Sequence, residues 1–160
     1  MNKRYQFSDS QKEIVINKYD TPTPWMNYLS NGTFYTMISQ AGGGVAFYKS
    51  PQIWRINHYR FFHLPTDRSG FYTYIKDGDT VFCPTAEPTP KKPEEWSATH
   101  GMGYTKFHSK LDGITADAKY FVGPFENGKY MESLSGRKKL PFLAQYLLLC
   151  NRNIPRCRIP

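Results

Sequence analysis

The sequence predicts an all-β protein, an antiparallel β-sandwich, from its composition, its turn residues and the spacing of its apolar runs. Phe, Trp and Tyr make up 16% of the 160 residues, and aromatic side chains favour pleated, half-buried strands. Twelve Gly and twelve Pro residues supply turns between short strands. Few stretches show helical periodicity. A chain of this length has room for one domain with a real hydrophobic core.

The first half of the chain predicts a series of short strands. Residues 13–16 form a short apolar run, and the prolines within 21–24 force an extended backbone. Strand-like runs at 25–29 and 33–38 are joined by Ser30-Asn31-Gly32, in which Asn-Gly is a strong hairpin signal. The glycines at 42–44 allow a sharp turn before a further strand at 45–48. Residues 52–66 have no clean period, and we expect an ordered loop there.

Two more hairpins are predicted in the second half. Runs at 71–75 and 80–82 flank Asp77-Gly78-Asp79, and runs at 103–108 and 114–122 flank Asp112-Gly113. The proline-rich residues 84–93 predict a long surface loop that is in part polyproline-like. Short strands separated by such turns are typical of a sandwich or a barrel.

A boundary is predicted near residue 125, where the alternation of apolar and polar residues stops. Residues 126–160 hold seven of the 21 Lys and Arg residues but only two of the 13 Asp and Glu residues. The net charge of +8 therefore belongs largely to this segment, and it does not indicate a nucleic-acid-binding surface on the folded body. We expect a β-sandwich domain over 1–125 and a poorly ordered basic tail over 126–160.

Several classes of function are disfavoured by missing motifs. The first twenty residues lack the apolar core of a signal peptide, and no apolar run is long enough to span a membrane. Three cysteines are too few for a disulfide framework, so a cytoplasmic protein is predicted. Residues 40–44 lack the Lys-Ser/Thr ending of a phosphate-binding loop. The histidines show no metal-ligand spacing, and no nucleophile elbow occurs, so we expect no metal, no cofactor and no catalytic residue.

Aromatic and planar polar side chains are dense in the predicted loops. Aromatic rings stack on the C–H faces of sugars, while Asn, Asp and Arg hydrogen-bond hydroxyl groups in pairs. The same residue types suit a protein–protein interface. Most of the aromatic residues, among them Trp25, Tyr28, Phe47 and Tyr120, are expected in the core. The candidates for a sugar site or an interface are Tyr59, Arg60, Asp67, Arg68, Tyr74 and His100.

Five motifs occur in the order found in one enzyme family. They are Thr21-Pro-Thr-Pro-Trp-Met-Asn-Tyr-Leu29, Ala41-Gly-Gly-Gly-Val-Ala-Phe-Tyr48, Arg55-Ile-Asn-His-Tyr-Arg60, Asp67-Arg-Ser-Gly-Phe-Tyr-Thr-Tyr74 and His100-Gly-Met-Gly-Tyr-Thr105. Together they resemble the amino-terminal domain of glycoside hydrolase family 94, the cellobiose phosphorylase type. Tyr5-Gln-Phe-Ser-Asp9 is similar to the family's opening strand.

The resemblance implies both a fold and a role. Members of that family have an amino-terminal β-sandwich, a helical linker, a catalytic (α/α)₆ barrel and a small carboxy-terminal β domain, and they are usually homodimers. They cleave β-linked disaccharides with inorganic phosphate as co-substrate and invert the anomeric centre, giving α-glucose 1-phosphate. The catalytic aspartate lies in the barrel, and the amino-terminal domain packs on the barrel and the dimer mate. We therefore expect an accessory domain that is inactive alone.

The sequence also departs from the family pattern. Residues 82–88 lack the usual Trp-x-Pro-x-Trp motif, and Gly70-Phe-Tyr72 stands where relatives often have Gly-Arg-Tyr. After residue 124 the resemblance is expected to end, as a truncation or a shifted reading frame would produce. Two alternatives stay open: a stand-alone carbohydrate-binding module, and a nucleic-acid-binding protein whose basic tail contains Phe142 and Tyr146.

Overall fold

The computed structural model describes residues 4–57 and 70–124, together with the backbone of 129–136. Within these ranges it contains eleven strands and no helix. The strands are β1 (Tyr5–Ser8), β2 (Glu13–Ile16), β3 (Met26–Ser30), β4 (Phe34–Ser39), β5 (Gly44–Tyr48), β6 (Ile75–Asp77), β7 (Thr80–Phe82), β8 (Glu95–Gly101), β9 (Tyr104–Leu111), β10 (Ile114–Val122) and β11 (Lys129–Gly136).

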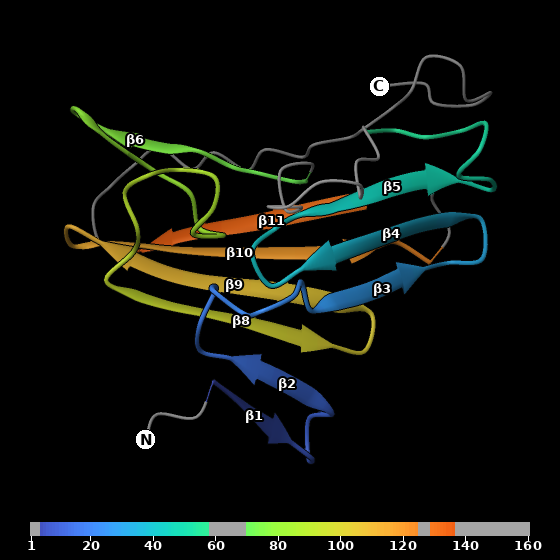
Figure 1. The fold of residues 1–160 in the computed structure, drawn as a ribbon, viewed down its shortest axis with the longest axis horizontal. Helices are drawn as coiled ribbons and strands as arrows, with labels where there is room; N and C mark the ends of the chain where they lie inside the picture. The colour runs from blue at the N-terminus through green and yellow to red at the C-terminus, as the bar shows by residue number, and fades with distance from the viewer. Residues whose placement is uncertain (1–3, 58–69, 125–128, 137–160) are drawn as a thin grey trace.

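The strands form three antiparallel sheets (Figure 1). The large sheet has the order β1-β2-β8-β9-β10-β11, the second sheet has the order β3-β4-β5, and β6 and β7 form a separate ribbon. Strands next to each other within a sheet pair antiparallel. The predicted all-β antiparallel sandwich is confirmed.

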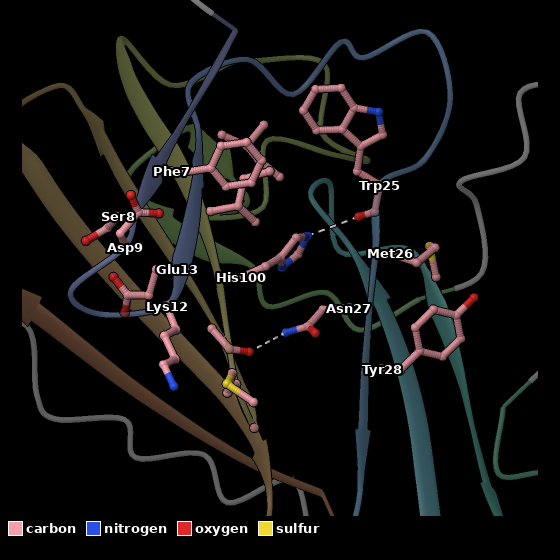
Figure 2. A pocket seen from close by; sticks show the side chains of 15 residues that line it. Phe7, Ser8, Asp9, Lys12, Glu13, Trp25, Met26, Asn27, Tyr28 and His100 are labelled. Atoms are coloured by element: carbon pink, nitrogen blue, oxygen red, sulfur yellow. Dashed lines mark hydrogen bonds between the residues drawn. The ribbon is translucent and has the colours of Figure 1, made fainter.

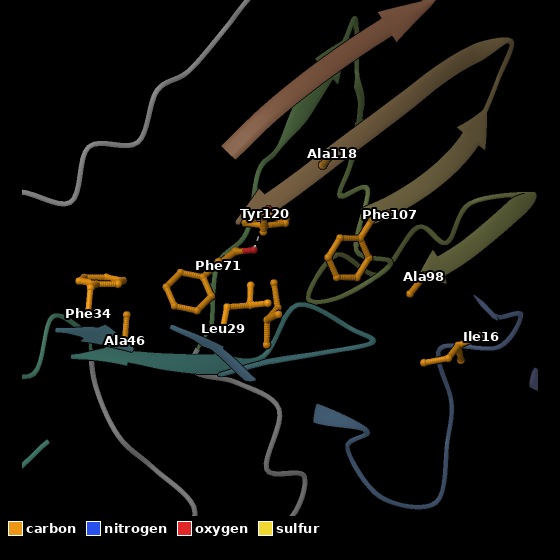
Figure 3. Close-up of a cluster of buried hydrophobic side chains, with 10 residues drawn as sticks. Ile16, Leu29, Phe34, Ala46, Phe71, Ala98, Phe107, Ala118 and Tyr120 are labelled. Atoms are coloured by element: carbon orange, nitrogen blue, oxygen red, sulfur yellow. Dashed lines mark hydrogen bonds between the residues drawn. The ribbon is translucent and has the colours of Figure 1, made fainter. Parts of the chain in front are cut away.

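The core lies between the large sheet and β3-β4-β5 (Figure 3). Alternation on the long strands sends every second side chain inward, as in β9, where Thr105, Phe107, Ser109 and Leu111 are all buried. Removing one large apolar side chain from water contributes about 1.5–3 kcal/mol. The main cluster is made of Ile16, Leu29, Phe34, Ile38, Ala46, Phe71, Ala98, Phe107, Ala118 and Tyr120.

Local turn chemistry explains the hairpins. Asp112 and Gly113 both have positive φ, at 49° and 77°, which is the backbone of a two-residue hairpin turn, and they connect Leu111 to its partner Ile114. At the β3–β4 turn, the Oδ1 atom of Asn31 accepts hydrogen bonds from the backbone N–H groups of Thr33 (3.1 Å) and Phe34 (2.8 Å). These two predicted hairpins are confirmed, and the third forms as the β6–β7 ribbon, which pairs Asp77 with Thr80.

The glycines at 42–44 make the sharp turn that was predicted between β4 and β5. Gly44 has a φ of +156°, and an added Cβ would lie 2.0 Å from the carbonyl oxygen of Met37. A Cβ on Gly42 would lie 2.7 Å from Cγ2 of Thr85. Only glycine therefore lets this turn approach its neighbours.

The proline-rich segment is only partly a surface loop, contrary to the prediction. Residues 83–86 are buried, and Cys83 and Thr85 are fully covered. The segment can be buried because its polar atoms have local partners: the Thr85 hydroxyl donates to Glu87 O (2.7 Å), and Trp96 Nε1 donates to Pro84 O (3.1 Å).

Strand β8 was not predicted, and residues 71–74 were predicted as strand but lie outside any strand. The inward-facing residues of β8 include Ala98 and His100, which give no apolar alternation. Tyr28, expected in the core, is 71% exposed, because alternation along β3 sends Leu29 inward and its neighbour outward. Tyr120 is buried as expected.

The predicted boundary near residue 125 is too early. β11 pairs with β10 along its whole length, from Val122 opposite Lys129 to Thr115 opposite Gly136. The large sheet therefore continues into the segment that was assigned to the basic tail. Apart from β11, the residues for which poor order was predicted lie outside the described ranges.

Candidate functional site

An open groove runs between the β1–β2 hairpin and β3 (Figure 2). Its volume is about 620 Å³, and the β8–β9 turn forms part of its lining. Figure 2 shows the hairpin side chains on one side, those of β3 on the other, and His100 between them. The lining residues are 7–9, 12–14 and 16 of the hairpin, 25–28 around β3, and 100–103 at the turn.

Asn27 fastens β3 to the large sheet at this groove. Its Nδ2 atom lies 3.1 Å from Gly101 O, 2.8 Å from Tyr104 O and 3.1 Å from Thr105 Oγ1. Asn27 faces inward on β3, on the same side as Leu29, because side chains alternate along a strand. The Asn27 amide thus joins the two layers by hydrogen bonds, whereas an apolar side chain at this position could only pack against the large sheet.

His100 extends the same network. Its Nε2 atom lies 3.0 Å from Trp25 O, and its Nδ1 atom lies 3.0 Å from Thr105 Oγ1. A carbonyl oxygen can only accept, so Nε2 must carry the proton and Nδ1 must accept from the Thr105 hydroxyl. Thr105 in turn accepts a hydrogen bond from Asn27. Each polar group of this network therefore has a hydrogen-bond partner while the imidazole is neutral. Burial lowers the pKa of His100 from its ordinary value of 6.5, although the hydrogen bond to Trp25 raises it in part.

Glu13 is a buried carboxylate on the hairpin side of the groove. Its Oε1 atom accepts a short hydrogen bond from the Tyr104 hydroxyl, and Lys106 Nζ lies 3.4 Å away. The hydrogen bond to the carboxylate raises the pKa of the Tyr104 phenol, and burial adds to this effect. Lys106 Nζ also lies 4.6 Å from the centre of the Tyr104 ring. The carboxylate is therefore partnered, and it acts here as part of the framework.

An aromatic ledge, made of Tyr5, Phe7 and Trp25, borders the groove. Tyr5 contacts both other rings edge-on, with centroid distances of 5.5 Å to Phe7 and 5.4 Å to Trp25. Phe7 is 71% exposed, and Figure 2 shows its ring directed toward the groove. Tyr28, which also lines the groove, is equally exposed.

Two of the predicted site residues, Tyr74 and His100, are described by the structure, and one of these two lies at the groove. His100 lines it, whereas Tyr74 is 56% exposed just before β6 and is not among the lining residues. Tyr59, Arg60, Asp67 and Arg68 lie outside the described residues. These assignments stay predictions.

Sequence reasoning missed Asn27 and Glu13 as members of a site. The sequence did contain a signal for Asn27. In the predicted strand 25–29 it is a polar residue two positions from Leu29, so both side chains point to the same, inward face. Glu13 gave no comparable signal, because its partner Tyr104 is distant in sequence.

No three His, Cys, Asp or Glu side chains in the described ranges lie close enough to hold a metal ion. No helix there is long and apolar enough to cross a membrane.

The sequence model of the glycosyl hydrolase 94 supersandwich domain matches residues 12–132 of this chain. The chain belongs to the glycosyl hydrolase 94 family. The match extends past residue 124 and includes part of β11, so the point where the resemblance was expected to end is corrected by the family match as well as by the sheet.

Several of the similar curated proteins are phosphorylases, and this chain covers a small part of each of them. It is 34% identical over 127 residues to N,N'-diacetylchitobiose phosphorylase of Vibrio furnissii, which is 77% of this chain and 16% of that protein. It is 34% identical over 119 residues to 3-O-beta-D-glucopyranosyl-beta-D-glucuronide phosphorylase of Paenibacillus borealis, covering 72% and 14%. A match at 25% identity covers 4% of a cyclic beta-(1,2)-glucan synthase of Rhizobium meliloti. The chain thus spans about a sixth of the length of its first relatives.

Proposed function

We propose that this glycosyl hydrolase 94 domain is an accessory saccharide-binding and dimerisation domain of an inverting β-glucoside phosphorylase. The observation that carries the proposal is the match itself: it covers the supersandwich domain, and the relatives it aligns with are disaccharide phosphorylases. The partners of this domain are a catalytic helical barrel and a dimer mate, and the substrates are a β-linked disaccharide and inorganic phosphate. The protein works in the cytoplasm.

The chemistry of phosphorolysis explains why the domain depends on a partner. Breaking a glycosidic bond with inversion needs an acid on the leaving oxygen and phosphate held on the opposite face of the sugar. The buried carboxylate nearest the groove, Glu13, is already engaged by Tyr104 and Lys106. We therefore assign the domain to binding and support, with the reaction taking place in the barrel.

Activity assays of the isolated chain test the proposal. We expect no release of sugar 1-phosphate from cellobiose, laminaribiose or N,N'-diacetylchitobiose with phosphate, because the described residues do not position an acid together with a phosphate site. The full-length Vibrio furnissii enzyme assayed on N,N'-diacetylchitobiose serves as the positive control. Turnover above a buffer blank that survives repurification would overturn the proposed division of labour.

A stand-alone carbohydrate-binding module is the second candidate, and the exposed aromatic ledge favours it. Such a module would bind long cello-oligosaccharides more tightly than disaccharides, because more sugar units would contact the surface. Calorimetric titration with both lengths separates the two functions. Titration with single-stranded DNA at two salt concentrations covers the nucleic-acid alternative, since phosphate contacts weaken as salt rises.

A further inference from the structure

We propose that the groove between the β1–β2 hairpin and β3 is a saccharide subsite that holds one pyranose unit against the ring of Phe7. The inference rests on the proposed function and gives it a location. Of the two predicted site residues that the structure describes, His100 lies there and Tyr74 does not. The volume of about 620 Å³ falls within the range of roughly 300–1,000 Å³ that is usual for small-molecule sites.

The apolar side of the groove has the form of a stacking platform. Phe7 is 71% exposed, and its ring is fixed by Tyr5, which also contacts Trp25. Met102, at the β8–β9 turn, is 77% exposed and lines the same groove. A flat ring of this kind takes the C–H face of a pyranose.

The polar side of the groove supplies groups for sugar hydroxyls. Asp9 and Lys12 are exposed lining residues, and neither side chain makes a hydrogen bond or ion pair within the described part of the chain. Lys12 has a φ of 52°, a backbone conformation that is uncommon for residues other than glycine. The amide nitrogen of Asn27 is committed to the β8–β9 turn, while its carbonyl oxygen is left to accept from a ligand. A carboxylate, an ammonium group and an amide oxygen together suit neighbouring hydroxyl groups.

This combination favours a saccharide over a segment of protein. A protein segment covering the groove would remove Asp9 and Lys12 from water, and burying charges without matched partners is costly. A sugar keeps both groups hydrogen-bonded while its apolar face covers Phe7. Water can also remain at the open rim and bridge the outer hydroxyls.

Titration of the full chain with cellobiose and with N,N'-diacetylchitobiose tests the subsite, using Phe7→Ala and Ile53→Ala as a matched pair. Both side chains are 71% exposed, but only Phe7 lines the groove. We expect saturable binding that weakens about two- to tenfold in Phe7→Ala, because one stacking contact is worth about 0.5–1.5 kcal/mol, and no change in Ile53→Ala. Thermal melts of both variants should match that of the parent, since both side chains are exposed.

The remaining outcomes overturn the subsite in distinguishable ways. Tyr74→Ala is the third variant, because Tyr74 is an exposed sugar candidate away from the groove. If Tyr74→Ala weakens binding and Phe7→Ala does not, the groove is the wrong location while saccharide binding stands. If Phe7→Ala and Ile53→Ala weaken binding equally, the contact is not specific to the groove. If neither sugar binds at millimolar concentration, the subsite is wrong, and the proposed function is then judged by the phosphorolysis assays alone.

Discussion

At the scale of single residues, Asn27 joins the two layers of the sandwich with one amide group. Its Nδ2 atom serves Gly101 O, Tyr104 O and Thr105 Oγ1, and Thr105 is fully buried. The position also borders the groove, so the same side chain stabilises the fold and shapes the site. A polar contact can do this because its partners are oriented acceptors that an apolar residue would leave unpaired.

Replacing Asn27 by Ala should lower the free energy of unfolding by about 1–3 kcal/mol, because buried acceptors lose their donor. Urea denaturation at neutral pH measures the change. Asn17→Ala is the matched control, since that side chain is exposed and should change stability by less than about 0.5 kcal/mol. Equal losses in the two variants would show that the amide does not fasten the layers.

His100 should make the stability of the sandwich fall as the solution becomes acidic. Burial lowers its pKa below the ordinary value of 6.5, so the unfolded chain takes up the proton first when the pH falls through 6.5. Protonation of the unfolded state then favours unfolding, by at most about 1.4 kcal/mol for each pH unit, until the folded protein is protonated too.

Urea denaturation between pH 7.5 and pH 5, compared with His100→Gln, isolates this contribution. The variant can still donate to Trp25 O, but it has no ionisable ring. We expect its stability to depend less on pH than that of the parent over this range. If the free energies of unfolding of the two proteins changed equally with pH, the acid sensitivity would come from other groups.

At the scale of elements, β11 decides how the large sheet ends. It pairs with β10 from Val122 to Thr115 and thereby covers that strand's edge, which would otherwise be open to pairing with another chain. A chain that ends at residue 124 should therefore melt at a lower temperature and self-associate more than one that ends at residue 136. Sedimentation velocity and thermal melts of the two chains measure both effects. Identical behaviour would mean that β11 contributes nothing to the sheet in solution.

The elements that could be predicted are those defined by local chemistry. Asn31-Gly32 and Asp112-Gly113 mark two hairpins because their backbone preferences do not depend on distant residues. β8 could not be predicted in this way, because Ala98 and His100 face inward and break the apolar pattern. Asn127-Gly128, between β10 and β11 in the sequence, is also typical of a hairpin. The charged residues that follow it favoured a basic tail instead.

The groove was harder to predict than the strands. It is assembled from residues 7–16, 25–28 and 100–103, and the hydrogen bonds that hold it cross more than seventy residues of sequence. His100 begins one of the family motifs in the sequence. Its role as the neutral link between Trp25 and Thr105 depends on tertiary contacts, which no local pattern reveals.

At the scale of the whole molecule, the chain corresponds to one domain of much longer relatives. The family match covers residues 12–132, whereas the aligned region is 16% of the Vibrio furnissii phosphorylase. The described strands form a sandwich with a shared core, so the unit can be transferred as one piece into a relative.

A domain exchange tests the central claim most directly. Residues 5–136 of this chain would replace the aligned segment of the N,N'-diacetylchitobiose phosphorylase of Vibrio furnissii, and release of sugar 1-phosphate from N,N'-diacetylchitobiose and phosphate would be measured. The controls are the relative lacking that segment and the exchange carrying Asn27→Ala, with a cooperative melt required of each protein assayed. We predict that the exchanged enzyme is active well above the deletion and that Asn27→Ala lowers its melting temperature. A folded exchanged enzyme no more active than the deletion would contradict the accessory role.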